Sequence, residues 1–142
     1  MKILFMCVAN SARSQLAEGL ARDLFKADNE IYSAGSKPAH VNPMAIAALN
    51  ECGIDIRTHR SKSIDELPQK FIKNLDFVIT LCAEEVCPII ISSAKKIPWP
   101  HSDPAGKGGT PEQELQRFRQ VRNQIREKLV SFGALHNLLK EG

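Results

Sequence analysis

The chain has 142 residues, of which 43% are hydrophobic and 25% are charged, and its formal net charge is +3. This size and composition predict one globular domain over residues 1–142. The charge excess is small and no run of like charges forms a basic arm, so we expect no nucleic-acid partner. No apolar run approaches a membrane span and the start lacks a cleavable signal pattern, so we expect no membrane association and a cytoplasmic location.

Short apolar runs alternate with amphipathic stretches along the chain. Strands are predicted over residues 2–7, 30–33, 76–81 and 95–99. Helices are predicted over residues 15–26, 43–52 and 70–74, and from a capping box at Thr110 to about Leu139. The glycine-rich residues 101–110 are predicted to form a loop between the last strand and the last helix.

This alternation predicts an α/β fold, a single-domain, doubly wound, four-stranded parallel sheet with helices on both faces. Ligands of such folds bind beyond the carboxyl ends of the strands. Cys7 ends the first predicted strand, Cys82 follows the third and Asp103 follows the fourth. We therefore expect these three side chains at the same edge of the sheet.

The run from Cys7 to Ser14 lies between the first predicted strand and the first predicted helix. Backbone N–H groups in such a loop can converge on an oxyanion, and the helix adds a partial positive charge. Arg13 can bind two oxygens at once, and the same field would stabilise a thiolate at Cys7. The run predicts a phosphate-binding loop after the first strand. The competing interpretation is a buried, inert cysteine beside a surface arginine.

Two further residues of this run have a functional and an ordinary interpretation. Ser14 could donate a hydrogen bond to the Cys7 sulfur, or it could be a simple helix N-cap, and the two roles are compatible. Asn10 tolerates a positive φ and could hold the loop through its side chain, but a plain turn asparagine is equally consistent with the pattern.

An ordered set of segments resembles the low-molecular-weight protein tyrosine phosphatase superfamily and, within it, the thioredoxin-coupled arsenate reductases. The segments are residues 7–14, 15–19, 32–35, 41–43, 80–82 and 103–107. Because the resemblance runs nearly end to end, it implies a single phosphatase-like arsenate reductase domain over residues 1–142. The bound oxyanion would then lie against the loop residues Val8, Ala9, Asn10, Ser11, Ala12, Arg13 and Ser14.

The resemblance also implies a reaction, the reduction of arsenate to arsenite for arsenic detoxification. Cys7 attacks arsenate and forms an arseno-cysteine, and Cys82 then attacks the Cys7 sulfur so that arsenite leaves. Cys87 attacks Cys82, which leaves a Cys82–Cys87 disulfide for thioredoxin or a related dithiol protein to reduce. No tightly bound cofactor and no metal is expected, and we expect a monomer.

Asp103 precedes a proline, and the resemblance implies that it is the general acid that protonates the leaving oxygen. An ordinary Asp-Pro turn is the alternative. We interpret His101 as a loop histidine near the site. Some relatives bind potassium near the loop through an acidic side chain. Glu18 matches part of that arrangement, and the Lys62 ammonium could take the place of the ion.

The Cys82 and Cys87 pair has other interpretations. A zinc site could use this spacing, but no matching second pair is present. Two inert core cysteines are also compatible with the pattern. Many members of the resembled group have six residues between the corresponding cysteines, whereas this chain has four. Cys52, at the end of a helical pattern, is interpreted as structural.

Two other functions remain open. The first is a protein tyrosine phosphatase or small phosphomonoesterase that uses Cys7, Arg13 and Asp103. The chain has one tyrosine and one tryptophan, and only Trp99 is placed to help wall the site, which favours a small inorganic anion. Phosphate and sulfate should therefore compete with arsenate. The second is a redox-controlled oxyanion sensor, against which the intact catalytic set argues.

Overall fold

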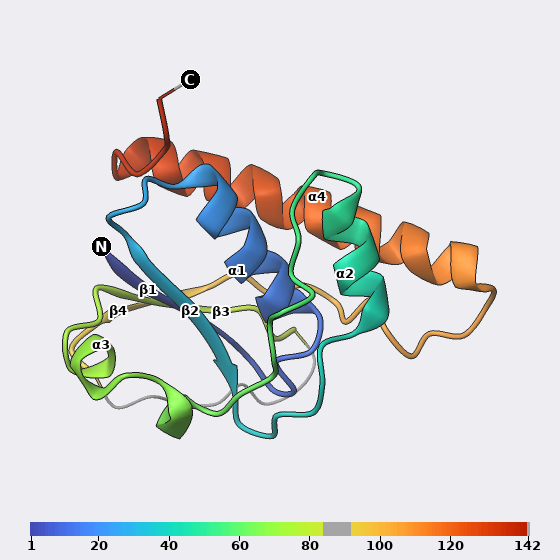
Figure 1. The fold of residues 1–142 in the computed structure, drawn as a ribbon, viewed down its shortest axis with the longest axis horizontal. Coiled ribbons are helices and arrows are strands. Elements are labelled where there is room, and N and C mark those ends of the chain that lie inside the picture. Colours follow the sequence, from blue (N-terminus) through green and yellow to red (C-terminus); the bar gives the residue numbers. More distant parts are fainter. Residues whose placement is uncertain (84–91, 142) are drawn as a thin grey trace.

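The protein, for which we have a computed structural model, is described over residues 1–83 and 92–141. Its centre is a parallel sheet in the strand order β2-β1-β3-β4 (Figure 1). The strands are β1 (Lys2–Cys7), β2 (Glu30–Gly35), β3 (Phe77–Thr80) and β4 (Lys95–Pro98). The predicted four-stranded parallel sheet is confirmed, and the chain runs outward from β1 to β2 before it crosses back to β3.

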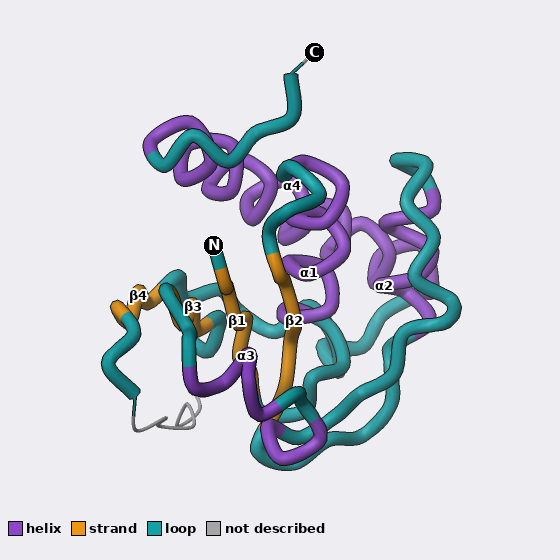
Figure 2. Tube along the Cα trace, turned by 60° about the vertical axis from the view of Figure 1, so that its left-hand side comes forward, coloured by secondary structure: helices purple, strands orange, loops and turns teal. Residues whose placement is uncertain are grey.

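Helices cover both faces of this sheet, as predicted, but unequally (Figure 2). The larger layer consists of α1 (Arg13–Leu24), α2 (Pro43–Asn50) and α4 (Pro111–Leu135). The smaller layer consists of the 3-10 turn η1 (Ile64–Glu66) and α3 (Gln69–Lys73). None of the helices in the described ranges is both long and apolar enough to cross a bilayer.

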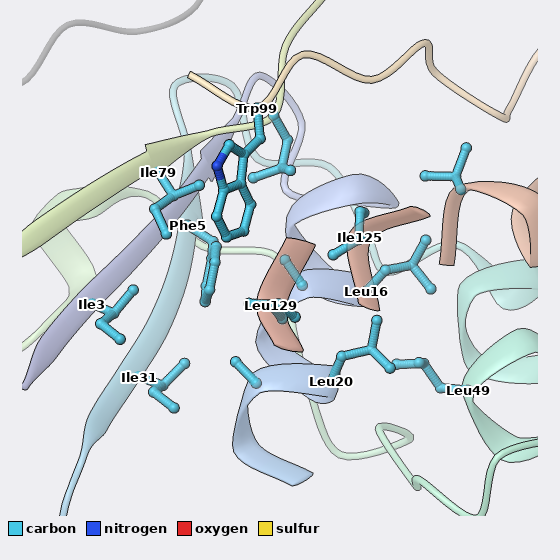
Figure 3. Packing of buried hydrophobic residues seen from close by; sticks show 14 of the residues in the cluster. Ile3, Phe5, Leu16, Leu20, Ile31, Leu49, Ile79, Trp99, Ile125 and Leu129 are labelled. Carbon is cyan, nitrogen blue, oxygen red and sulfur yellow. The ribbon is translucent and has the colours of Figure 1, made fainter. Parts of the chain in front are cut away.

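The main core lies between the sheet and the larger helical layer. Successive residues of a strand point to opposite faces, so Ile3 and Phe5 of β1 point to this core while Leu4 and Met6 point to the other face. Figure 3 shows Ile3 and Phe5 opposite side chains of α1 and α4. The sheet is thus held on both faces, and its carboxyl-terminal edge carries the loops.

The starts of α2 and α4 follow their predicted caps, whereas α1 begins after Ala12 with no side-chain cap, so the interpretation of Ser14 as an N-cap was wrong. The side chain of Asn42 accepts a hydrogen bond from the backbone N–H of Met44, and Pro43 occupies the first turn of α2. Thr110 and Gln113 form the predicted reciprocal capping box of α4. The start of α4 therefore follows directly on the 101–110 loop.

The predicted end of the last helix at about Leu139 was wrong, because α4 ends at Leu135. Asn137 has φ 56, and Leu138 N–H donates to the Gly133 carbonyl at 2.8 Å, which is the bonding pattern of a Schellman motif. Leu138 is buried, and Leu139 instead pairs with Phe25 in an antiparallel bridge. Apolar residues after the helix therefore pack on α1 from an irregular segment.

Candidate active site

The 7–14 loop, which joins β1 to α1, has its carbonyls tied to a neighbouring segment. The carbonyls of Val8 and Ala9 accept hydrogen bonds from the N–H groups of residues 37 and 39, at 2.9 and 3.1 Å. In the described part of the chain, the backbone N–H groups of residues 8–12 make no hydrogen bond to a backbone carbonyl in the loops and turns. These donors are thus available for an oxyanion at the start of α1.

A glycine lets the end of β2 approach this loop. A Cβ atom on Gly35 would lie 2.4 Å from the Val8 carbonyl oxygen and 2.9 Å from the Asn10 nitrogen. No larger residue fits there without moving the loop backbone. The end of the 32–35 segment, which carries part of the resemblance, therefore packs directly against the backbone of the 7–14 loop.

Asn10 holds the loop from within. Its φ is 49, as the positive-φ prediction requires, and the side chain is fully buried. The amide nitrogen donates to Ser14 Oγ at 2.7 Å and to Ser33 Oγ at 2.9 Å. The amide oxygen accepts from Gln15 Nε2 and from the backbone N–H of Lys62, both at 3.1 Å. All these bonds fix the loop conformation before any ligand binds.

Cys7 carries a free, buried thiol at the end of β1. Its Sγ lies 2.8 Å from Ser14 Oγ. Since the Asn10 amide already donates to that oxygen, the Ser14 hydroxyl hydrogen is free to point at the sulfur. The hydrogen-bond chain therefore leaves Ser14 able to donate to the Cys7 sulfur, as the sequence suggested.

Arg13 connects the loop to the ends of the other strands. Its buried guanidinium donates to the backbone carbonyl of His101 at 2.9 Å and to that of Leu81 at 3.5 Å. Arg13 Nη2 lies 3.9 Å from Asp103 Oδ2. The arginine is thereby oriented by residues that follow β3 and β4, with a carboxyl group beside it.

His101 lies near the site, as predicted, but the sequence did not indicate its contact. Its backbone carbonyl orients Arg13, and its ring Nδ1 lies 2.8 Å from the Trp99 carbonyl. Burial lowers the pKa of the His101 ring below its ordinary value. A neutral ring limits the positive charge beside Arg13.

A pocket of about 130 Å³ lies where these groups meet. It is lined by Cys7, Ala9, Ser11, Ala12, Arg13, Ala39, Asp103 and Ala105. Of Cys7, Cys82 and Asp103, which were expected to converge at the sheet edge, Cys7 and Asp103 line this pocket together with Arg13, whereas Cys82 is not among the lining residues. The Asp103 carboxyl accepts the Ala105 N–H at 3.0 Å, which turns the 101–110 loop back over the pocket. The described lining contains no aromatic side chain, and four of its eight residues are alanines.

A charged pair lies behind the loop. The Lys62 ammonium is 3.4 Å from Glu18 Oε1 and 3.4 Å from Ser33 Oγ, and Ser33 Oγ donates to the same carboxylate at 2.6 Å. Burial alone would raise the pKa of Glu18, but Lys62, the Ser33 hydrogen bond and Arg22 together lower it. The ammonium thus lies beside the buried carboxylate, where the sequence suggested a cation.

The remaining cysteines differ in their surroundings. Cys82 is half-buried and follows Leu81, whose N–H donates to the Met6 carbonyl at 2.9 Å, so Cys82 leaves the sheet beside the strand that ends in Cys7. Cys82 is disulfide-bonded, and Cys87 lies outside the described residues. Cys52 is exposed in the turn after α2, so its interpretation as a structural cysteine was wrong.

Trp99 does not wall the pocket, contrary to the expectation from its position. Its side chain is buried in the main core, with its ring centroid 5.7 Å from that of Phe132 (Figure 3). Trp99 follows β4, and its side chain lies on the face of the sheet that α4 covers. Burying the apolar ring there is more favourable than leaving it exposed beside the pocket. The pocket therefore has no described aromatic wall.

The β1–loop–α1 segment thus brings Cys7 and Arg13 beside Asp103 in one pocket, which is the arrangement that the resemblance to the phosphatase superfamily implies. The chain belongs to the low molecular weight phosphotyrosine protein phosphatase family, which it matches over residues 2–141. It is 44% identical over 132 residues to the arsenate reductase of Staphylococcus aureus strain Newman, covering 92% of this chain and 94% of that protein.

Two solved structures agree with this family assignment. An arsenate reductase in the phosphate binding state is 32% identical, with a TM-score of 0.71, and the match covers 94% of this chain and 98% of that chain. The thioredoxin-dependent arsenate reductase of Corynebacterium glutamicum is 31% identical, with a TM-score of 0.63, covering 91% of this chain and 60% of that chain. The resemblance inferred from the motifs is confirmed.

Proposed function

We propose that this protein reduces arsenate to arsenite, with Cys7 as nucleophile and electrons from thioredoxin or a related dithiol protein. The observation that carries the proposal is the meeting of Cys7, Arg13 and Asp103 in one pocket of about 130 Å³. Relatives named arsenate reductase support this substrate. We propose that the protein acts as a monomer in the cytoplasm, where a reducing environment keeps such thiols ready.

In the first step the Cys7 thiolate attacks arsenic. A sulfur–arsenic bond forms and an arsenic–oxygen bond breaks, while Asp103 gives a proton to the leaving oxygen, which departs as water. Arg13 and the free N–H groups of the loop bind the remaining oxygens and stabilise the charge that develops on them. The product of this step is an arseno-cysteine that still contains As(V).

The second step is the redox step, in which Cys82 attacks the Cys7 sulfur. A sulfur–sulfur bond forms, and the sulfur–arsenic bond breaks with its electron pair left on arsenic, so As(V) leaves as arsenite. Cys87 then attacks Cys82 and frees the Cys7 thiolate. The external dithiol reduces the resulting Cys82–Cys87 disulfide, which completes a balanced two-electron cycle.

The shape of the pocket favours a small inorganic anion over a phosphotyrosine ring. The described wall includes four alanines, at positions 9, 12, 39 and 105, and no aromatic residue, and the chain's single tryptophan packs in the core instead. Arsenate and phosphate are similar in size and charge, so phosphate and sulfate should compete. The family to which the chain belongs also contains phosphatases, so aryl-phosphate hydrolysis is the alternative activity to measure.

The decisive assay is arsenate-dependent NADPH oxidation with thioredoxin and thioredoxin reductase, run beside aryl-phosphate hydrolysis. We expect multiple turnovers with arsenate. Cys82→Ser should stop these turnovers. It should leave any phosphatase activity intact, since phosphate hydrolysis needs Cys7 but neither of the other two relay cysteines. Cys87→Ser should permit one turnover and trap a Cys7–Cys82 disulfide.

Peptide mapping after arsenate treatment without reductant separates the two functions. The wild-type protein should contain a Cys82–Cys87 disulfide formed in proportion to the arsenite released. Mapping must start from a fully reduced sample, since Cys82 is disulfide-bonded in the structure. If both thiols stay free after arsenate treatment, the reductase proposal is wrong and the phosphatase takes its place.

A further inference from the structure

The 101–110 loop, which carries Asp103, has little backbone support. Among the described residues, no backbone–backbone hydrogen bond joins residues 102–109 to another segment. Its three glycines, at positions 106, 108 and 109, have φ values of 71, 76 and 89. A cavity of about 610 Å³ separates part of the loop from α4. Something other than sheet or helix bonding must therefore set its position.

One side chain of α4 spans this loop. Arg117 Nε donates to the Pro104 carbonyl at 3.2 Å, and Arg117 Nη2 donates to the Gly108 carbonyl at 2.7 Å. The first of these carbonyls belongs to the residue directly after Asp103. The second lies four residues further along, beyond the turn at Gly106.

We propose that Arg117 is a positioning residue for the reaction: its guanidinium bridges two carbonyls of the 101–110 loop and thereby holds the Asp103 carboxyl over the anion pocket. The planar guanidinium donates in two directions at fixed geometry, whereas a lysine ammonium would not span both carbonyls. Arg13 holds the loop from the opposite side, at the His101 carbonyl. Asp103 therefore lies between two arginines that hold the loop. Arg13 lines the anion pocket, and Arg117 does not.

This inference rests on the proposed acid role of Asp103, so the test measures both residues. The readout is the rate of arsenite release in a single turnover, with enzyme in excess over arsenate. Arg117→Ala should slow release by about 10- to 100-fold, the effect of a slightly misplaced catalytic group. Asp103→Asn should slow it by about 10²- to 10⁴-fold.

The double variant distinguishes positioning from a general structural role. If Arg117 acts through Asp103, then Arg117→Ala combined with Asp103→Asn should release arsenite no more slowly than Asp103→Asn alone. Phosphate affinity, measured by calorimetry, should be unchanged in Arg117→Ala because the 7–14 loop is intact. Arg126→Ala, on an exposed site of the same helix, is the matched control and should behave like the wild type.

Four outcomes would overturn the inference. A wild-type rate of arsenite release by Arg117→Ala would show that Arg117 does not act through Asp103. The same conclusion would follow if the rate losses of the two single variants added fully in the double variant. Normal release by Asp103→Asn itself would instead remove the acid role and this inference with it. Should Arg117→Ala not fold, Arg117→Lys replaces it, because it keeps the charge and loses the bridge. Wild-type release by that variant would overturn the inference as well.

Discussion

The two sides of the anion pocket are built differently. The 7–14 loop is fixed by a buried network in which Asn10 alone makes bonds to two serines, a glutamine and a backbone N–H. The 101–110 loop is held over residues 102–109 by side chains, chiefly Arg117, and by the turn at Asp103. The first side is organised before the substrate arrives, and the second depends on a few polar contacts.

This difference fits the tasks that we propose for the two sides. A bound oxyanion needs donors and charge at fixed positions, because electrostatic stabilisation is lost when they must reorganise. A proton donor must reach the leaving oxygen only during the reaction and can tolerate a less rigid support. Substitutions on the two sides should therefore separate binding from proton transfer.

The largest effect should come from the nucleophile. Cys7→Ser should abolish arsenate reduction, because serine lacks the thiol that forms the arsenic and disulfide bonds. Phosphate binding and the folded state should persist, since the donors of the loop remain. Coupled NADPH oxidation measures the first effect and calorimetry the second. Cys52→Ser, which changes an exposed thiol, is the control and should be fully active. Arsenate reduction by Cys7→Ser would end the assignment of the nucleophile.

The next effect tests the 101–110 loop. Asp103→Asn should slow the first chemical step by about 10²- to 10⁴-fold while leaving phosphate affinity and the cysteine relay intact. Rapid-quench measurement of arsenite release from the pre-reduced protein reports this step. A matching loss of phosphate affinity would mean that Asp103 organises the pocket and does not act as the acid.

The third effect tests the rigid side through its central residue. Asn10→Ala should destabilise the fold by about 1–3 kcal/mol from stranded hydrogen-bond partners, with a further ~1–2 kcal/mol because alanine must adopt a φ near 49. Asn10→Gly is the matched control, since it loses the same side chain but accepts that φ. Denaturant unfolding gives both values. Equal stability of the two variants would show that the loop backbone relaxes when the side chain is gone.

The smallest effect concerns acid sensitivity on the same side. The pKa of Glu18 is lowered in the folded state, so its stabilisation is complete above its ordinary value of 4.5 and is lost as pH falls through the lowered folded pKa. Unfolding free energy should therefore decline more steeply below pH 4.5 in the wild type than in Glu18→Gln. Glu127→Gln, an exposed change on α4, should keep the wild-type slope. Identical slopes in all three proteins would mean that the ionised Glu18 and its partners together contribute nothing to acid stability.

The order of strands and helices could be read from the sequence because periodicity and caps are local properties. The continuous apolar run of residues 2–7 and the caps at Asn42 and Thr110 correspond to the observed elements. The 7–14 run likewise carries its chemistry in adjacent residues, so the nucleophile and its arginine could be proposed together. The parallel sheet then brings Asp103 to the same edge, since all its strands end there.

Contacts between distant segments could not be predicted in this way. The carbonyl that orients Arg13 belongs to a residue 88 positions away, and no local pattern marks it. Trp99 and the end of α4 were misjudged for the same reason: burial against α4 and the packing of Leu138 decide them. The sequence by itself determined which groups can react. Only the tertiary structure decided which carbonyls hold Arg13 and Arg117, because hydrogen bonds across the fold depend on packing.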